Sequence, residues 1–321
     1  MVVFITSAIG IGIIFLYGCL GEIITEKAGH LNLGIPGIMS VGASGGCFGV
    51  WLYLKGTTSA SDVNYLLAVL IAFFFAVLFA VITGLIYAFL TVSLRANQNV
   101  TGLTITTFGS GLTMFMKENV MKNSAAYYAR ASKQIAQGLP FADKLGWFGE
   151  IFLSHGIFVY LAIAIAIATA FVFKKSRVGL HLRAVGENPA TADAVGIDVT
   201  KYKYLAICIG SAIAGLGGMY YILDYNNGSW EYGIEAFGWL SIALVIFALW
   251  KPNLSIFGSI LFGCLYIAGT YMDINSFGTK QLLKLLPYVV TIIVLIITSI
   301  MDKKENQPPA ALGLSYFREE R

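Results

Sequence analysis

Charged side chains are scarce in this sequence. Asp, Glu, Lys and Arg make up only 12% of the 321 residues, whereas hydrophobic residues make up 57%. A soluble domain usually carries about 25% charged residues, so the composition excludes an ordinary water-facing surface. Apolar segments recur along nearly the whole sequence, which predicts one membrane domain. The small net charge of +4 gives no indication of a nucleic-acid partner.

The sequence also lacks the signatures of common catalytic and metal sites. It contains no G-x-x-x-x-G-K-[ST] phosphate-binding loop and no H-E-x-x-H zinc motif, and its three histidines are scattered. The four cysteines, Cys19, Cys47, Cys208 and Cys264, lie in apolar stretches without metal-ligand spacing, which predicts buried reduced thiols. We therefore predict a chain that is not an enzyme and has no metal site.

Long apolar segments predict the fold. A membrane-spanning helix needs about 20 apolar residues. The candidates are 2–20, 37–54, 65–94, 99–118, 152–173, 203–224, 237–250, 253–273 and 282–300. The predicted fold is all-α and polytopic, with about nine (eight to ten) spans, some of them broken or half-helices. The membrane domain is expected over 1–301, followed by a tail over 302–321.

Basic residues predict the orientation of the chain. Six Lys and Arg residues lie in the loop 174–203, and such loops face the cytoplasm. With alternating spans, this placement puts the N-terminus outside and the tail in the cytoplasm, in a protein of the cell membrane. Glu22 and Asp224 fall near the ends of spans, where we expect them to lie at the membrane interface.

The same loop contains the signals for a short helix. Asn188 can cap the free N–H groups at a helix start, and Pro189 suits the first helical position. Gly196 is a natural stop. The helix of 189–195 is too short to be stable alone, so it must pack against something. It is either an ordinary amphipathic helix lying on its own domain or a docking helix for a cytoplasmic partner.

Neutral polar side chains gather near the fourth predicted span. Amides that faced lipid would be costly, so we expect them to face protein or water. The candidate residues of a solute pathway are Asn32, Asn97, Gln98, Asn99, Thr101 and Thr104. Alternatively, the threonines donate to their own helix and help neighbouring helices to associate. Trp230, Tyr232 and two nearby glutamates form either an interfacial aromatic belt or an outer gate or docking surface.

Four stretches, taken in order, resemble the permeases of ABC importers for branched-chain amino acids, simple sugars and nucleosides. They are 29–43, with Gly-His-Leu-Asn-Leu-Gly-Ile-Pro-Gly; 94–103, with Leu-Arg-Ala-Asn-Gln-Asn; 178–197, with Val-Gly-Leu-His-Leu-Arg-Ala-Val-Gly-Glu-Asn-Pro; and 309–321, with Pro-Ala-Ala-Leu-Gly. The last stretch is similar to the tail of the nucleoside-type members. The resemblance extends over nearly the whole chain.

The resemblance implies partners and roles. Two permease chains, often non-identical, share one pathway; cytoplasmic ATPase subunits, which bind ATP and Mg²⁺, dock below, and an extracytoplasmic binding lipoprotein delivers substrate. It implies that ATPase coupling involves Glu187, Asn188, Pro189, Ala190, Thr191, Ala192, Asp193, Ala194, Val195 and Gly196. The chain itself would bind no cofactor. The predicted substrate is a nucleoside, and a simple sugar or another small polar solute is the alternative.

Two other classes of protein remain as alternatives. A self-sufficient secondary transporter or channel usually carries ionisable residues in the middle of its spans, and here the span centres contain almost none. A structural membrane scaffold would need no polar pathway.

Overall fold

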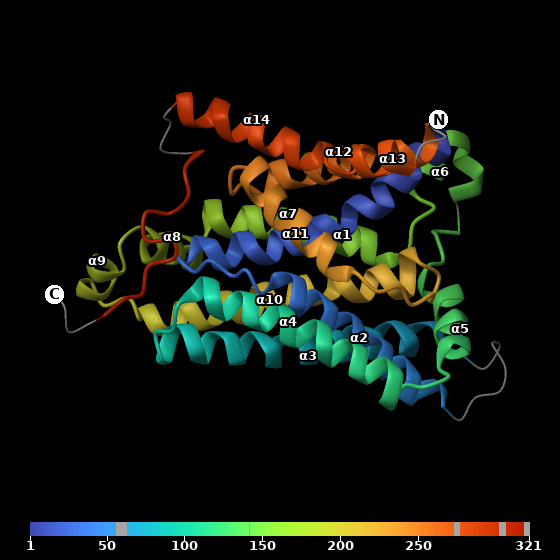
Figure 1. Ribbon diagram of the computed structural model, residues 1–321, viewed down its shortest axis with the longest axis horizontal. Helices are drawn as coiled ribbons and strands as arrows, with labels where there is room; N and C mark the ends of the chain where they lie inside the picture. The colour runs from blue at the N-terminus through green and yellow to red at the C-terminus, as the bar shows by residue number, and fades with distance from the viewer. Residues whose placement is uncertain (56–62, 141, 273–276, 302–305, 318–321) are drawn as a thin grey trace.

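The computed structural model describes residues 1–55, 63–140, 142–272, 277–301 and 306–317, and all regular structure in these ranges is helical. The long helices lie side by side along the longest axis (Figure 1). They are α1 (Val2–Lys27), α2 (Ile35–Leu54), α3 (Tyr65–Ala88), α4 (Gln98–Phe115), α7 (Ile157–Lys175), α10 (Val199–Tyr220), α11 (Ile234–Phe247), α12 (Pro252–Tyr271) and α14 (Leu286–Met301). The shorter ones are α5 (Ala125–Ile135), α6 (Gly146–Phe152), α8 (Arg177–Glu187), α9 (Pro189–Ala194) and α13 (Phe277–Leu283).

Six helices of the described chain are long and apolar enough to cross a membrane. They are α1, α2, α7, α12, and α3 and α10 with the π-helical turns that extend them to Ser93 and Tyr225. This count is below the predicted number of about nine. The three remaining predicted segments are helical, but α4 is less hydrophobic because of its threonines and amides, and α11 and α14 are shorter. The all-helical class of the prediction is confirmed.

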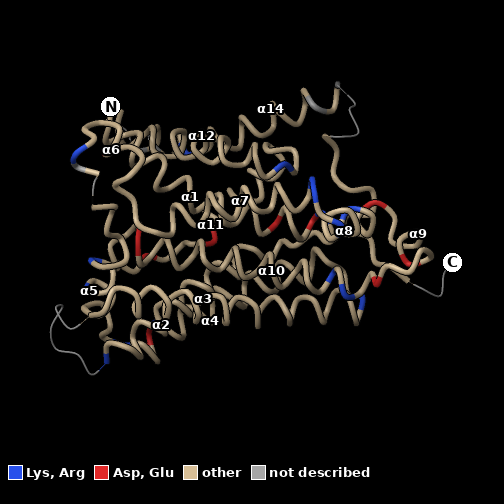
Figure 2. Tube along the Cα trace, turned by 180° about the vertical axis from the view of Figure 1, so that it is seen from behind, with Lys and Arg blue, Asp and Glu red and all other residues tan. Residues whose placement is uncertain are grey.

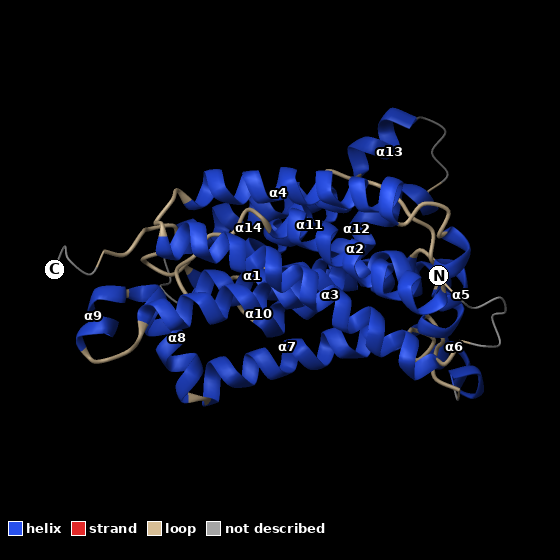
Figure 3. Cartoon of the chain, turned by 90° about the horizontal axis from the view of Figure 1, so that it is seen from below, coloured by secondary structure: helices blue, strands red, loops and turns tan. Residues whose placement is uncertain are grey.

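The core is built around α1, α2 and α10. Nearly all of α2 and most of α1 are buried, whereas α3 and α7 expose long apolar faces, as lipid-facing helices do. Glycines allow the central helices to approach closely: a Cβ on Gly42 would lie 2.3 Å from the Cα of Gly215, and one on Gly218 would lie 1.8 Å from the carbonyl oxygen of Met39. The helices α4 and α7 lie on opposite faces of this core (Figure 3).

The ends of the bundle differ in character. The N-terminus, α5 and α6 lie at one end, and α8, α9 and the C-terminal segment lie at the other (Figure 1). We call them the α6 end and the α9 end. Lys and Arg lie toward these two ends, while several acidic residues lie deeper in the bundle (Figure 2). The N-terminus and the C-terminal segment 306–317 therefore lie at opposite ends of the bundle.

Two expectations about polar and thiol side chains were wrong. Glu22 is 0% exposed and Asp224 only 8%, so both are enclosed within the helix bundle rather than exposed to water or headgroups. Both are carried by helices that are surrounded by other helices, which hydropathy alone does not reveal. Of the four thiols, Cys19 and Cys47 are buried, but Cys208 and Cys264 are only partly buried.

Candidate functional site

The predicted docking helix forms as a short projection at the α9 end (Figure 1). The Oδ1 of Asn188 accepts a hydrogen bond from Thr191 N–H at 2.9 Å, which caps the first turn. Gly196 follows the helix with φ +86°, a left-handed conformation that favours glycine. The capped helix predicted over 189–195 is confirmed, with its last helical residue at Ala194.

One alanine holds α9 against the rest of the chain. Ala192 is 2% exposed and packs with Val185 of α8 and Val199 of α10. The surface around it faces outward, with Ala190 exposed and Val195 71% exposed. The helix thus packs on its own domain through this small residue, while Ala190, Ala194 and Val195 remain exposed.

The C-terminal segment 306–317 runs along the α9 end and fastens several parts of it. We call this segment the C-terminal strap. Its Ala311 N–H donates to the carbonyl of Gly186 in α8 at 3.0 Å, and its Gly313 N–H donates to the carbonyl of Gly29 at 3.3 Å. The strap therefore joins the α8–α9 hairpin to the loop that connects α1 and α2. In the sequence, only the short Pro-Ala-Ala-Leu-Gly run at 309–313 marks the segment that makes these contacts.

Two side chains extend the same connections. The hydroxyl of Tyr316 in the strap donates to the Oδ2 of Asp193 in α9 at 2.8 Å. Gln98, the first residue of α4, accepts from Leu31 N–H at 2.9 Å and donates to the carbonyl of Leu314 at 3.4 Å. The coupling region, the α1–α2 loop and the start of α4 thus form one hydrogen-bonded network.

Asn32 organises the α1–α2 loop from inside. Its side chain is fully buried; its Oδ1 accepts from Gly34 N–H at 2.9 Å, and its own N–H donates to Glu22 Oε1 at 2.8 Å. These bonds hold the backbone where the chain turns from α1 into α2. Leu31 and Leu33, rather than Asn32, line the neighbouring cavity.

That cavity, of about 530 Å³, lies between the α1–α2 loop, α11, α14 and the strap. It contains Glu26, whose carboxylate accepts a hydrogen bond from the indole N–H of Trp250. Leu249 and Trp250 have left-handed φ values of 53° and 54°, which are rare for bulky residues and persist only where neighbours hold them. No pattern of residues predicts this buried contact between α1 and the α11–α12 turn.

The remaining predicted pathway residues lie along α4. Asn97 caps the helix by accepting from Val100 N–H at 3.1 Å, and Asn99 is exposed beside it. Thr101 is buried, whereas Thr104 lies on an exposed face and its hydroxyl donates to the carbonyl of Val100 at 2.8 Å. Thr104 therefore donates to its own helix, as the alternative interpretation of the threonines expects, and it also faces outward.

A second cavity, of about 290 Å³, opens toward the α6 end between α2, α4 and the segment 230–235. Hydroxyls, aromatic rings and two carboxylates line it, among them Ser110, Thr113, Trp230 and Glu235. The loop before α11 is thus more than an aromatic belt, because it forms one wall of this cavity.

Two hydrogen bonds fix the loop that forms this wall. Tyr232 donates its hydroxyl proton to Glu118, just beyond α4, and Glu231 accepts from the hydroxyl of Tyr221 at 2.8 Å. The first bond connects the loop to the end of α4, and the second connects it to the end of α10.

Comparison with known proteins identifies the family. Residues 4–296 match the protein family described as "branched-chain amino acid transport system / permease component". The chain belongs to this permease family. No solved structure matches the permease.

Three curated relatives are similar over most of their length. A protein of Haloferax volcanii, provisionally described as a glucose ABC transporter permease, is 32% identical over 95% of this chain and 94% of its own. A nucleoside ABC transporter permease of Lactococcus lactis is 30% identical over 87% of both chains. A guanosine ABC transporter permease of Bacillus subtilis is 28% identical over 94% of this chain and 92% of its own. The permease is therefore a multi-pass cell-membrane subunit of the ABC transporter class.

Proposed function

We propose that this permease carries nucleosides into the cell as one chain of an importer driven by separate ATPase subunits. The cavity of about 290 Å³ carries the proposal. A nucleoside presents hydroxyls and ring N–H groups, which can pair with the hydroxyls of Ser110 and Thr113 and with the carboxylate of Glu235. Its flat base can pack on Trp230. Two of the similar permeases are named for nucleosides, which supports the same class.

The pathway we propose runs along the exposed face of α4. From the outer cavity it passes Thr104 and reaches the α9 end beside Asn97 and Asn99. We propose that α4, α11 and α14 also cross the bilayer. In a pair of permease chains, this face of α4 then lies toward the second chain, which differs in sequence. The α9 end then faces the cytoplasm and the N-terminus faces outside.

Coupling to ATP hydrolysis is proposed for residues 187–196. A cytoplasmic ATPase binds the exposed surface of α9, and its closure moves the helix. The strap transmits that movement through Gly186 and Gly29 to the α1–α2 loop, and through Gln98 to α4. In this mechanism Asn32 positions the loop, and Asn97, Asn99, Thr101 and Thr104 belong to the pathway or its support. An extracytoplasmic binding lipoprotein delivers the substrate at the α6 end.

A simple sugar is the second candidate, because the glucose-permease relative is 32% identical over nearly the whole chain. Uptake of a radiolabelled nucleoside by cells that express the complete importer separates the two. We expect competition by unlabelled nucleosides and none by glucose. Trp230→Ala should reduce nucleoside uptake more than Trp230→Phe, which retains a ring for stacking. Uptake of radiolabelled glucose by the same cells, with no uptake of the nucleoside, would replace this assignment with the sugar one.

A further inference from the structure

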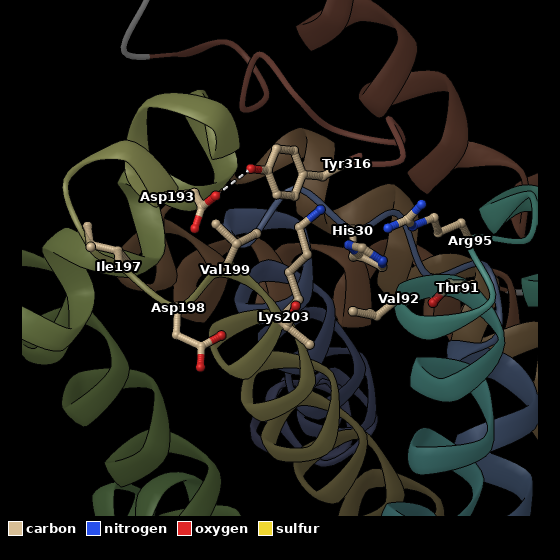
Figure 4. A pocket seen from close by; sticks show the side chains of 12 residues that line it. His30, Thr91, Val92, Arg95, Asp193, Ile197, Asp198, Val199, Lys203 and Tyr316 are labelled. Carbon is tan, nitrogen blue, oxygen red and sulfur yellow. Dashed lines mark hydrogen bonds between the residues drawn. The ribbon is translucent and has the colours of Figure 1, made fainter. Parts of the chain in front are cut away.

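A polar pocket of about 470 Å³ opens at the α9 end and has no role in the transport path described above (Figure 4). Its walls come from the α1–α2 loop, the end of α3, the turn between α9 and α10, the first residues of α10 and the strap. The lining side chains used below are His30, Arg95, Asp193, Asp198, Lys203 and Tyr316.

Lys203 places a buried positive charge in this pocket. The residue is 2% exposed, its ammonium group points into the pocket, and it makes no ion pair with any residue in the described ranges (Figure 4). Charges that are removed from bulk water are normally paired, because an unpaired one is costly. An anionic group bound in the pocket beside this ammonium would pair its charge.

Two more basic side chains face the same position. Arg95 has a left-handed φ of 56°, and its guanidinium carbon lies 4.7 Å from the centre of the Phe317 ring. This contact holds the guanidinium group across the mouth of the pocket. His30 is 1% exposed, and burial together with the nearby charge of Lys203 lowers its pKa to about 3. At neutral pH the imidazole is therefore uncharged and adds no third positive charge beside the two cations.

The opposite wall carries two carboxylates that are already engaged. Asp193 accepts the hydroxyl proton of Tyr316 at 2.8 Å, and Asp198 caps α10 by accepting from Lys201 N–H at 2.9 Å. Figure 4 shows both on the side of the pocket away from Arg95. A ligand that fits must place an anionic group toward Lys203 and groups that donate hydrogen bonds toward the carboxylates.

We propose that this pocket binds a phosphate-bearing ligand, and that the ligand is a nucleoside monophosphate. Its phosphate would lie between Lys203 and Arg95, and its ribose hydroxyls would donate to the carboxylates of the opposite wall. The choice of a nucleotide rests on the proposed nucleoside function, since phosphoryl transfer to an imported nucleoside produces such a compound. Because Asp193 and Tyr316 both line the pocket, an occupied pocket restrains α9 and slows import when the product accumulates.

The test uses the complete purified importer, with its ATPase, as wild type and as Lys203→Met. Methionine removes the charge and retains most of the volume. Lys201→Met is the matched control, because that side chain is exposed on the same helix two residues earlier. Equilibrium binding of adenosine monophosphate is measured in detergent, and the ATPase, which is identical in all three complexes, contributes the same background to each.

We expect Lys203→Met to weaken the permease-dependent binding by about tenfold or more, as loss of one hydrogen bond to a charged group does, and Lys201→Met to leave it unchanged. Lys203→Met should fold, because it removes a buried unpaired charge, and its melting temperature without ligand should be no lower than that of the wild type. Equal binding by wild type and Lys203→Met overturns the proposal.

Parallel measurements distinguish the source of the phosphate. Vesicles with anionic phospholipid that shift the melting temperature of the wild type but not of Lys203→Met, with no effect of the nucleotide, assign the phosphate site to a lipid headgroup and overturn the nucleotide. The third outcome is that no phosphate compound binds, and that Lys203 is protected from an amine-modifying reagent only when the ATPase is docked. The pocket then receives a side chain of the ATPase, and the proposal fails. These outcomes do not depend on which solute is transported, so the proposed function can fail while this site stands.

Discussion

The hydrogen bond between the strap and α9 can be removed with a single-atom change. In Tyr316→Phe the ring remains, and only the hydroxyl that donates to the Oδ2 of Asp193 at 2.8 Å is lost. A hydrogen bond to a charged group contributes about 1.5–3 kcal/mol. Both side chains are partly exposed, so solvent screening reduces the expected loss to about 1–1.5 kcal/mol.

That loss makes the strap detach more often. A free energy of about 1–1.5 kcal/mol corresponds to a fivefold to tenfold rise in the detached population, since about 1.4 kcal/mol is a factor of ten. The amides of Ala311 and Gly313 report detachment directly, because they donate to Gly186 and Gly29 only while the strap is docked. Their hydrogen-exchange rates in the purified importer should therefore rise about fivefold to tenfold.

A double-mutant cycle separates this bond from other effects of substitution. Asp193→Ala and Tyr316→Phe should each accelerate exchange, and the double variant should be no faster than the faster single variant. Unchanged exchange of Ala311 and Gly313 in Tyr316→Phe would show that this hydrogen bond does not hold the strap in place. So would fully additive effects, because they would mean that the two groups do not interact.

Two further predictions concern stability. The pKa of His30 is about 3 in the folded chain against an ordinary value of 6.5, so only the unfolded chain binds the proton between those values and stability falls as pH drops through that window. Between pH 7 and pH 5, the melting temperature of His30→Asn should therefore fall less than that of the wild type. Equal falls in the two proteins would contradict this prediction. Gly218→Ala places a Cβ 1.8 Å from the Met39 carbonyl and should destabilise the helix pair by about 3 kcal/mol or more, whereas Gly111→Ala, with nothing within 4 Å, should be neutral or slightly stabilising in thermal unfolding. Similar melting temperatures for these two glycine variants would show that α2 and α10 are not closely packed.

The sequence predicted the helical class and the short docking helix because both depend on local signals. Hydropathy identifies apolar segments, and the Asn188-Pro189 start and the Gly196 stop are encoded within nine residues. It could not predict where Glu22 lies around α1, because a uniformly apolar helix gives no indication of which side faces lipid.

The tertiary contacts of the site were inaccessible for a different reason. The strap meets α8, the α1–α2 loop and α4 through backbone carbonyls, whose positions leave no pattern in the side chains. The contact between Glu26 and Trp250 joins residues 224 positions apart. An amide near a span predicts a pathway residue at Gln98, and the structure shows this side chain buried, with hydrogen bonds to Leu31 and Leu314.

We propose that α9 couples ATP hydrolysis to import. The direct measurement is the ratio of nucleoside taken up to ATP hydrolysed by the complete importer in proteoliposomes, for wild type and for Val195→Asp. Val195 is exposed at the tip of the projection, so the substitution leaves the packing of Ala192 intact. Ala126→Glu, at an exposed position of α5 at the opposite end, is the control. We expect Val195→Asp to lower the ratio by about tenfold or more, as a substitution at the centre of a docking surface does, while the control retains it. An unchanged ratio in a Val195→Asp importer that inserts and assembles normally would contradict the claim.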